Sequence, residues 1–383
     1  METLQVKNIG PIDNANIDFG DLTIFVGPQA TGKSLLLQLI DLIHSSGYIK
    51  KDLEIWGYGW KDIKKEFYSL YFGGGMQNAF GEKSEVIFND KPYNLEQEIK
   101  KSRERKFSHF YIPAQRVMIM DQGWARPFSG FDHSYPHVLK QFSEIIRLEL
   151  DNWSARNKIL FPQQNKLRKE LRGIIQKNIF RQGEIIFKTV SGRKQLVMSL
   201  KDNIELSVGG WSAGQKEFAP LLFGLYWALP SGKVQRRDHV KYITIEEPEM
   251  GLHPSAILDV MLLIFELLLR GYKITISTHS NTILELMWGI SEIKKNKNSI
   301  KKNEAEEKFL NLFSINSKNK DIINFAKEIL SKTYKIYYFD NENLGVQTKD
   351  ITSLDLEEKS NWGGIAEFSG KVADIVGSIY GDK

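Results

Sequence analysis

Apolar residues in this chain of 383 residues fall into short runs, which are typical of strands, and longer stretches with helical spacing. The runs at 22–26 and 242–245 are each predicted to be a buried strand, and the run at 273–277 is predicted to be a further strand. A helix is predicted directly after the first run, in LLLQLIDLI, and another shortly after the third, in NTILELMWGI.

Further elements are predicted between and after these strands. Apolar residues at helical spacing with interleaved charge predict a short helical insertion at about 135–180, and then a β-hairpin that turns at Ser191-Gly192. Another hairpin is expected in SEVIFNDKPYNLEQEI, and the tail is expected to form two strands and a terminal helix after Trp362. The charged stretch 291–309 is interpreted as a solvated linker or helix face, with a nucleic-acid contact as the alternative.

Composition narrows the class of protein. The chain has no cysteine, which excludes disulfides, thiolate metal sites and cysteine nucleophiles and fits a reducing cytoplasm. Its N-terminus has no apolar run that could serve as a signal peptide, and the stretch VMLLIFELLL at 260–269 is too short to span a bilayer. We therefore expect a soluble, cytoplasmic protein that has no membrane partner.

The net charge of +5 is mildly basic. It favours an ordinary lysine-rich surface, and a weak electrostatic footprint for DNA or RNA is the alternative.

The sequence GPQATGKS lies between the first predicted strand and its helix, and it matches G-x-x-x-x-G-K-[ST]. Glycines at these positions let successive backbone N–H groups turn toward a phosphate, and the helix N-terminus adds partial positive charge. Lys33 would reach the β- and γ-phosphates, and the Ser34 hydroxyl would bind Mg²⁺. The residues expected to surround the phosphates are Gly27, Gln29, Ala30, Thr31, Gly32, Lys33 and Ser34.

Two carboxylates end the second predicted strand, where burial makes them costly unless they have a function. With a phosphate loop in the same chain, Glu246 is the candidate metal ligand and Glu247 the candidate base that activates water. A third candidate, His279, ends the next predicted strand, where a neutral imidazole could contact the γ-phosphate or the water.

The motifs GPQATGKS, SAGQKE, ITIEEPEMGLHP and ISTHS, in this order, resemble the Walker A, signature, Walker B/D-loop and switch-histidine motifs of ABC-type ATPase heads. The opening of the chain also looks like the first β-layer of such heads in the SMC/RecF/OLD branch. The resemblance implies an α/β fold, a P-loop NTPase head with an antiparallel β-layer and a helical insertion. It also implies ATP and Mg²⁺ as cofactors. Residues 1–290 would form the head, interrupted at about 116–182, and 291–383 a charged linker and a C-terminal α/β extension.

In ABC-type heads the signature faces the nucleotide held by a second subunit. The resemblance therefore implies a homodimer with composite ATP sites, with a higher-order homo-oligomer left open. Ser212, Gly214 and Gln215 would contact the ATP of the partner. The Q-loop residue is either Gln115, which follows a strand-like run, or the neighbouring Arg116.

Three residues depart from the pattern of many relatives. Glu246 stands where many have Asp, which makes the metal geometry less certain, while Gln29 replaces Asn and Ala213 replaces Gly. Neither of the last two changes removes a charge or a required N–H.

The tail bears on the choice of function. OLD-type nucleases continue into a Toprim domain with a DxD pair, whereas this tail has Asp340-Asn341-Glu342. The layout and the WGG-x-x-EFS tail resemble the PARIS-type ATPase of bacterial phage defence, which implies a sensor that controls a separate Toprim-type effector nuclease. A RecF-like repair ATPase that binds DNA is the alternative. A transporter subunit is disfavoured, because IEEPE and the N-terminal sequence lean toward the DNA branch.

Overall fold

The structure is a computed structural model that describes residues 2–101, 106–163, 166–180, 182–190, 192–201, 204–230, 236–237, 239–299, 303–316, 319–341, 345–354 and 375. The chain divides into two compact units, each discontinuous in sequence. Unit 1 comprises Met1–Lys33, Glu82–Pro92 and Ile276–Lys383, and unit 2 comprises Ser34–Gly81 and Tyr93–Thr275. The predicted domain boundary at residue 290 stays a prediction.

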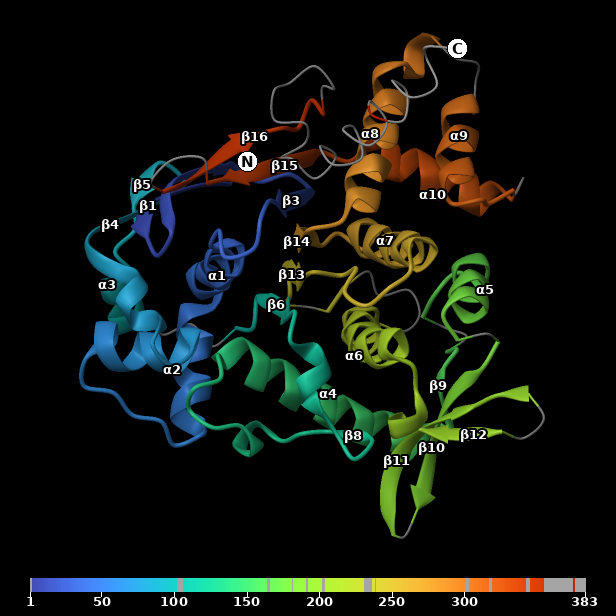
Figure 1. Cartoon of the computed structure of the whole chain (residues 1–383), viewed down its shortest axis with the longest axis horizontal. Coiled ribbons are helices and arrows are strands. Elements are labelled where there is room, and N and C mark those ends of the chain that lie inside the picture. Colours follow the sequence, from blue (N-terminus) through green and yellow to red (C-terminus); the bar gives the residue numbers. More distant parts are fainter. Residues whose placement is uncertain are drawn as a thin grey trace. The chain divides into compact units, whose positions relative to one another are not determined.

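A mixed sheet forms the centre of unit 1, with the strand order β5, β4, β1, β2, β16, β15, β3, β14 (Figure 1). Its strands are β1 (Thr3–Ile9), β2 (Ile12–Asp18), β3 (Leu22–Val26), β4 (Phe80–Phe88), β5 (Lys91–Pro92), β14 (Lys273–Thr278), β15 (Tyr334–Asp340) and β16 (Val346–Asp350). The strand β3 is buried at all five positions and runs parallel to β15. The N-terminal strands β1 and β2 form an antiparallel hairpin.

Three helices of unit 1 follow β14 in the chain: α8 (Asn281–Lys295), α9 (Glu304–Leu312) and α10 (Lys320–Ser331). They pack in sequence order, α8 on α9 and α9 on α10. A short 3-10 turn, Lys297–Ser299, lies between α8 and α9. The described parts of the charged stretch 291–309 are thus largely helical, as the helix-face interpretation expects. Its Glu306 is buried and pairs with Lys297 at 3.6 Å. The terminal helix predicted after Trp362 lies outside the described residues.

Unit 2 contains a short parallel pair of strands, β6 (His109–Ile112) and β13 (Tyr242–Glu246), beside the first half of β14. Its helices include α1 (Lys33–Ile55), α2 (Tyr68–Phe72), α3 (Leu95–Lys101), α4 (His137–Arg156), α5 (Lys169–Asn178), α6 (Ala213–Ala228) and α7 (Pro254–Leu269). The last of these is almost entirely apolar and buried, so it belongs to the core of the unit. Short helical turns are Ile63–Phe67, Met76–Ala79, Arg116–Ile119 (η3), Phe128–Gly130 and Val208–Gly210 (η6).

The insertion of unit 2 carries a four-stranded antiparallel sheet with the order β12, β11, β10, β9 (Figure 1). The bounds are β9 (Ile159–Phe161), β10 (Glu184–Val190), β11 (Arg193–Ser199) and β12 (Glu205–Ser207). A small hairpin, β7 (Met120–Asp121) and β8 (Trp124–Ala125), precedes α4. The predicted helical insertion is confirmed as α4 and α5, with β9 between them, and so is the hairpin of β10 and β11.

The hairpin predicted in SEVIFNDKPYNLEQEI is only half right. β4 and β5 pair as expected, whereas LEQEIKK forms α3. The Asn94 side chain accepts a hydrogen bond from the Gln97 amide at 3.0 Å and so caps this helix. Acidic residues in the first turn and lysines in the last turn also complement the helix dipole.

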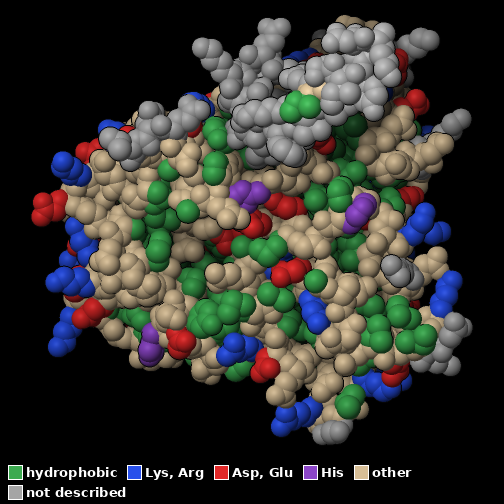
Figure 2. Space-filling model, in the orientation of Figure 1, with side chains coloured by type: hydrophobic (Ala, Val, Ile, Leu, Met, Phe, Trp, Pro, Cys, Tyr) green, Lys and Arg blue, Asp and Glu red, His purple; other side chains and the backbone are tan. Residues whose placement is uncertain are grey.

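The composition predicts an ordinary lysine-rich surface. On the face drawn in Figure 2, Lys and Arg side chains are interspersed with Asp and Glu. No helix among the described residues is long and apolar enough to cross a membrane.

Candidate functional site

The loop between β3 and α1, in unit 1, has a backbone that glycine makes possible. Gly27 has φ +147°, and a Cβ there would lie 2.7 Å from the carbonyl oxygen of Phe339 on β15. Gly32 has φ +87°, and its Cβ would meet the Ile12 side chain at 2.8 Å. Both positions therefore exclude a side chain, for reasons of space as well as conformation.

Lys33 is buried within this loop. Its ammonium donates to the carbonyl oxygens of Gly27 at 2.9 Å and Pro28 at 2.6 Å and to the Thr31 hydroxyl at 3.3 Å. The Thr31 hydroxyl in turn donates to Pro28 O at 2.9 Å. The loop thus encloses the cation, and the contact of Lys33 with phosphates stays a prediction. Gln29 is exposed, and Ala30 is held at φ +60°.

In unit 2, Ser34 and Glu246 are brought together. Glu246 ends β13 and is buried, and its Oε2 accepts a hydrogen bond from the Ala114 amide at 2.9 Å. Burial raises the pKa of Glu246, and the Ala114 amide and the hydroxyls of Ser34 and Tyr111 oppose that rise. Oε1 of the same carboxylate has no hydrogen-bond partner of ordinary length among the described residues. A serine hydroxyl beside a carboxylate with an unsatisfied buried oxygen fits a site for Mg²⁺.

Glu247 occupies an unusual backbone conformation. Its φ is +41°, in the left-handed region that residues with a side chain seldom adopt. Its carbonyl oxygen accepts from the Met250 amide at 3.1 Å and from the Arg116 guanidinium at 3.1 Å. Backbone strain of this kind costs about 1–3 kcal/mol and is often found at functional sites.

Arg116 is the residue at this strand end that the sequence could not single out. It is completely buried at the start of η3. Its guanidinium donates to the carbonyl oxygens of Glu246 at 2.9 Å, Glu247 at 3.1 Å and Glu217 at 3.2 Å. Gln115, by contrast, is exposed and makes no side-chain cap on η3. Of the two Q-loop candidates, the structure brings Arg116 against the acidic turn.

His279 lies at the end of β14, in unit 1, and is half-buried. The backbone turns there into α8, with the Ser280 amide donating to the Thr278 hydroxyl at 3.0 Å. The sequence prediction of a strand, then a histidine, then a helix is therefore confirmed.

The signature sequence begins α6 in unit 2. Ser212 is the N-cap and forms a capping box with Gln215, because Ser212 Oγ accepts from the Gln215 amide at 3.3 Å and Gln215 Oε1 from the Ser212 amide at 3.0 Å. Gly214 lies so close to the turn after β13 that a Cβ would be 2.7 Å from Gly251 O. Ser212, Gly214 and Gln215 also line a cavity of about 500 Å³. The helix start is thus fixed, and Ser212 stays exposed.

Comparison with known proteins gives several structures with low sequence identity. An SMC head bound to the C-terminal winged-helix domain of ScpA is 12% identical, with a TM-score of 0.45, 91% of this chain covered and 96% of that one. The SMC head domain from Thermotoga maritima is 11% identical, with a TM-score of 0.36 and coverages of 91% and 97%. The ADP conformation of an ABC transporter's ATP-binding cassette is 16% identical, with a TM-score of 0.31 and coverages of 74% and 84%.

No curated protein matches the sequence. A family model described as "AAA domain, putative AbiEii toxin, Type IV TA system" matches residues 22–285, which include the phosphate loop, the signature, the acidic strand end and His279. The match extends over more than half of the chain, and the protein therefore belongs to this family of AAA domains.

Proposed function

We propose that the protein is an ATPase that uses Mg²⁺. The observation that carries the proposal is the contact between Ser34, the residue after the loop lysine, and the buried carboxylate of Glu246. These two oxygen donors follow a phosphate loop and end a buried strand, which is where Mg²⁺ is held in P-loop ATPases. Membership of the AAA-domain family supports the same reading.

Each site residue has a role in this proposal. When bound, Mg²⁺ would neutralise charge on the phosphates. Lys33 would exchange the loop carbonyls for the β- and γ-phosphates, and the backbone amides of the loop would surround them. Glu247, whose backbone Arg116 holds, would accept a proton from the attacking water, and His279 would orient the γ-phosphate region.

We further propose that two copies of the chain close around ATP. Exposed Ser212 at the N-terminus of a sixteen-residue helix supports this, because an exposed helix start with a fixed cap can bind the phosphates of a partner subunit. Gly214 and Gln215 would complete that contact, and assembly beyond the dimer is left open by the proposal. Hydrolysis would reopen the pair.

The cellular role that we propose is control of a separate effector, a Toprim-type nuclease, in cytoplasmic anti-phage defence. The family description names a toxin and a toxin–antitoxin system, which supports a role in controlling a cellular or antiviral response. The layout of the sequence and its WGG-x-x-EFS segment, which resemble the PARIS-type ATPase, support the same assignment.

The catalytic proposal is tested by ATP turnover and by light scattering of the eluted protein. Glu247→Gln is expected to bind ATP, to hydrolyse it at least about a hundredfold more slowly and to elute as a dimer with ATP and Mg²⁺. Glu249→Gln, which makes the same change of charge in the same turn, is the matched control and should hydrolyse ATP at the wild-type rate. Wild-type turnover by Glu247→Gln would refute its assignment as the base.

The cellular proposal is tested by purifying tagged Glu247→Gln protein from its native host and identifying everything retained. A nuclease in stoichiometric amount would support control of an effector. Duplex DNA retained without a protein partner would instead support the RecF-like repair ATPase, and its binding should then weaken steeply as salt rises.

A further inference from the structure

A second cavity of unit 2, of about 440 Å³, lies beside the first turns of the signature helix, and the proposed ATPase does not use it. Its walls are η3 with the turn of the β7–β8 hairpin, strand β11, the turn η6 and the first turns of α6. The volume lies in the range of about 300–1,000 Å³ that is usual for small-molecule sites. The cavity can therefore hold a ligand of nucleotide size.

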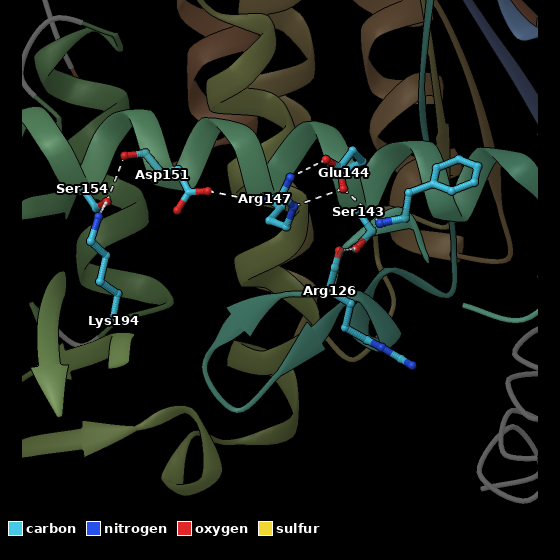
Figure 3. A network of polar contacts seen from close by, with 8 residues as sticks. Arg126, Ser143, Glu144, Arg147, Asp151, Ser154 and Lys194 are labelled. Atoms are coloured by element: carbon cyan, nitrogen blue, oxygen red, sulfur yellow. Dashed lines mark hydrogen bonds and ion pairs between the residues drawn. The ribbon is translucent and has the colours of Figure 1, made fainter. Parts of the chain in front are cut away.

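Two of these walls are anchored to the same helix, α4 (Figure 3). The Ser143 hydroxyl donates to Arg126 O at 2.6 Å, just after the β7–β8 hairpin. On the other side, the Lys194 ammonium of β11 donates to the Ser154 hydroxyl at 3.0 Å. Helix α4 thus contacts both the segment that follows the hairpin and β11.

The hairpin and β11 are also joined directly. The Leu196 amide donates to Gly123 O at 3.0 Å, and the Arg193 guanidinium donates to Gln122 Oε1 at 2.8 Å. The second of these bonds fixes the Gln122 side chain at the cavity wall.

The lining combines an apolar floor with a few polar groups. Trp211 is buried and its indole N–H donates to Leu206 O at 3.0 Å, so it presents carbon surface to the cavity. Val117 and Ala219 add to this surface. The side-chain amides of Gln122 and Gln195 are the polar groups on the hairpin and on β11.

Charge at the cavity favours an anion. Lys216 lines it, with its ammonium donating to Gly209 O at 3.0 Å across the wall. Arg193, two residues before Gln195 on β11, is a second cation on this side and bonds to Gln122. Lys194 lies on the other face of the strand, where it bonds to Ser154. Lys216 is the cation within the lining.

We propose that this cavity binds a nucleotide: a planar base against the apolar floor, with its polar edge on Gln122 and Gln195 and its phosphate on Lys216. Amide side chains offer a donor and an acceptor together, which suits the edge of a base, and a lysine ammonium suits a phosphate. The ligand is either a free nucleoside monophosphate or one nucleotide of a single strand, since both present this chemistry.

Occupancy of the cavity would act on the signature helix. Trp211 immediately precedes the cap residue Ser212, and Lys216 lies one turn further along α6. A nucleotide seated against both would hold the helix start in the geometry of the capping box. This consequence rests on the proposed ATPase function, whereas binding in the cavity does not.

The test uses full-length Lys33→Ala protein, in which nucleotide binding at the phosphate loop is expected to be lost. Calorimetry with AMP, GMP, CMP, UMP and a single-stranded DNA decamer then measures binding to sites other than the phosphate loop. Adding Lys216→Met should weaken binding at least about tenfold, since a charge-assisted hydrogen bond is lost. Adding Lys177→Met, an exposed lysine on α5, should change it less than about twofold.

A second variant, further along α6 than the signature residues, controls for misfolding caused by Lys216→Met. Ala219→Leu should reduce the cavity volume and weaken binding of the same probes, while circular dichroism reports an intact fold. Tighter binding of the decamer than of any monophosphate would identify a strand as the ligand, and the reverse would identify a free nucleotide. The proposal would be overturned if no probe bound at concentrations up to about 10 mM, or if Lys216→Met left the binding unchanged.

Discussion

Replacing Asp41 with Asn is expected to stabilise the protein above neutral pH, although it removes a buried hydrogen-bonding acid. Asp41 lies on α1, is buried, and places Oδ2 2.7 Å from the Tyr71 hydroxyl. That hydroxyl also lies 2.7 Å from Gln38 O, which can only accept. The Tyr71 hydroxyl has one hydrogen for these two acceptors, so the buried Asp41 carboxylate receives only a shared hydrogen bond from it. A buried carboxylate that is so weakly compensated favours its protonated form.

The surroundings of Asp41 agree with this assignment. Burial raises the pKa of Asp41 from 3.8 to about 7, and the hydrogen bond with Tyr71 opposes the rise. The neighbouring His109 has Nδ1 3.9 Å from Asp41 Oδ1, and burial, followed by the proximity of His44, lowers the pKa of His109 well below 6.5. His109 is therefore neutral near pH 7 and supplies no positive charge to the acid. Tyr48 and Tyr111 also lie within electrostatic range of Asp41, and both are neutral there.

The magnitude follows from proton linkage. Because the folded protein binds this proton more tightly than the unfolded chain, the stabilisation is complete below pH 3.8 and is lost as the pH rises to about 7. At about 1.4 kcal/mol per pH unit, the total loss is about 4 kcal/mol. Asn at this position cannot ionise, and its amide N–H can donate to Tyr71 as the protonated acid does. Asp41→Asn should therefore gain up to about 4 kcal/mol over wild type between pH 4 and pH 8.

The assay is urea unfolding of both proteins at several pH values, followed by tryptophan fluorescence. Six of the eight tryptophans, at positions 56, 60, 124, 153, 211 and 227, belong to unit 2, which contains Asp41. Asp151→Asn removes an exposed acid of the same unit and should show no comparable pH-dependent gain. A free-energy difference between wild type and Asp41→Asn that stays constant from pH 4 to pH 8 would refute the proton assignment.

Two further predictions concern the signature helix and Arg116, which bonds to it. Gly214→Ala places a Cβ 2.7 Å from Gly251 O, so it should lower the free energy of unfolding in urea by about 1–3 kcal/mol and weaken ATP-dependent dimerisation. Gly173→Ala is the control, because a Cβ there has nothing within 4 Å, and it should be neutral or stabilising. Equal behaviour of the two variants would show that the close approach at Gly214 carries no cost. Arg116→Lys leaves an ammonium that cannot reach all three carbonyl oxygens and should lower the free energy of unfolding by about 2–4 kcal/mol. Unchanged stability in urea would show that these three bonds contribute little.

Local signals predicted much of the fold. The strand at 22–26 and the helix after it follow from an apolar run and helical spacing, and the helix start at Ser212 follows from a residue that caps helices. The α3 helix was missed because its sequence also fits the second strand of a hairpin, and the Asn94 cap decided between the two. Patterns within a few residues therefore predict strands. They also predict helices, where a capping residue marks the start of the helix.

Contacts between distant residues lay beyond the sequence. Asp41 lies within an apolar helical stretch, and its state depends on Tyr71, thirty residues away. The sequence does not distinguish between Gln115 and Arg116 for the same reason. The choice depends on backbone carbonyls about 100 and 130 residues further along the chain, and no local pattern specifies such partners.

Arg116 connects two segments that the sequence places apart. One planar guanidinium bonds to the first turns of the signature helix, through Glu217 O, and to the acidic turn, through Glu246 O and Glu247 O. Because these donors have a fixed spacing, a displacement of α6 when a partner subunit binds must stretch one of the bonds or move the turn that carries Glu247. In the proposed ATPase the base would then be aligned only when α6 is in place, so that dimer closure and water activation are coupled within unit 2. Arg116→Lys should accordingly lower the rate of hydrolysis more than the affinity for ATP.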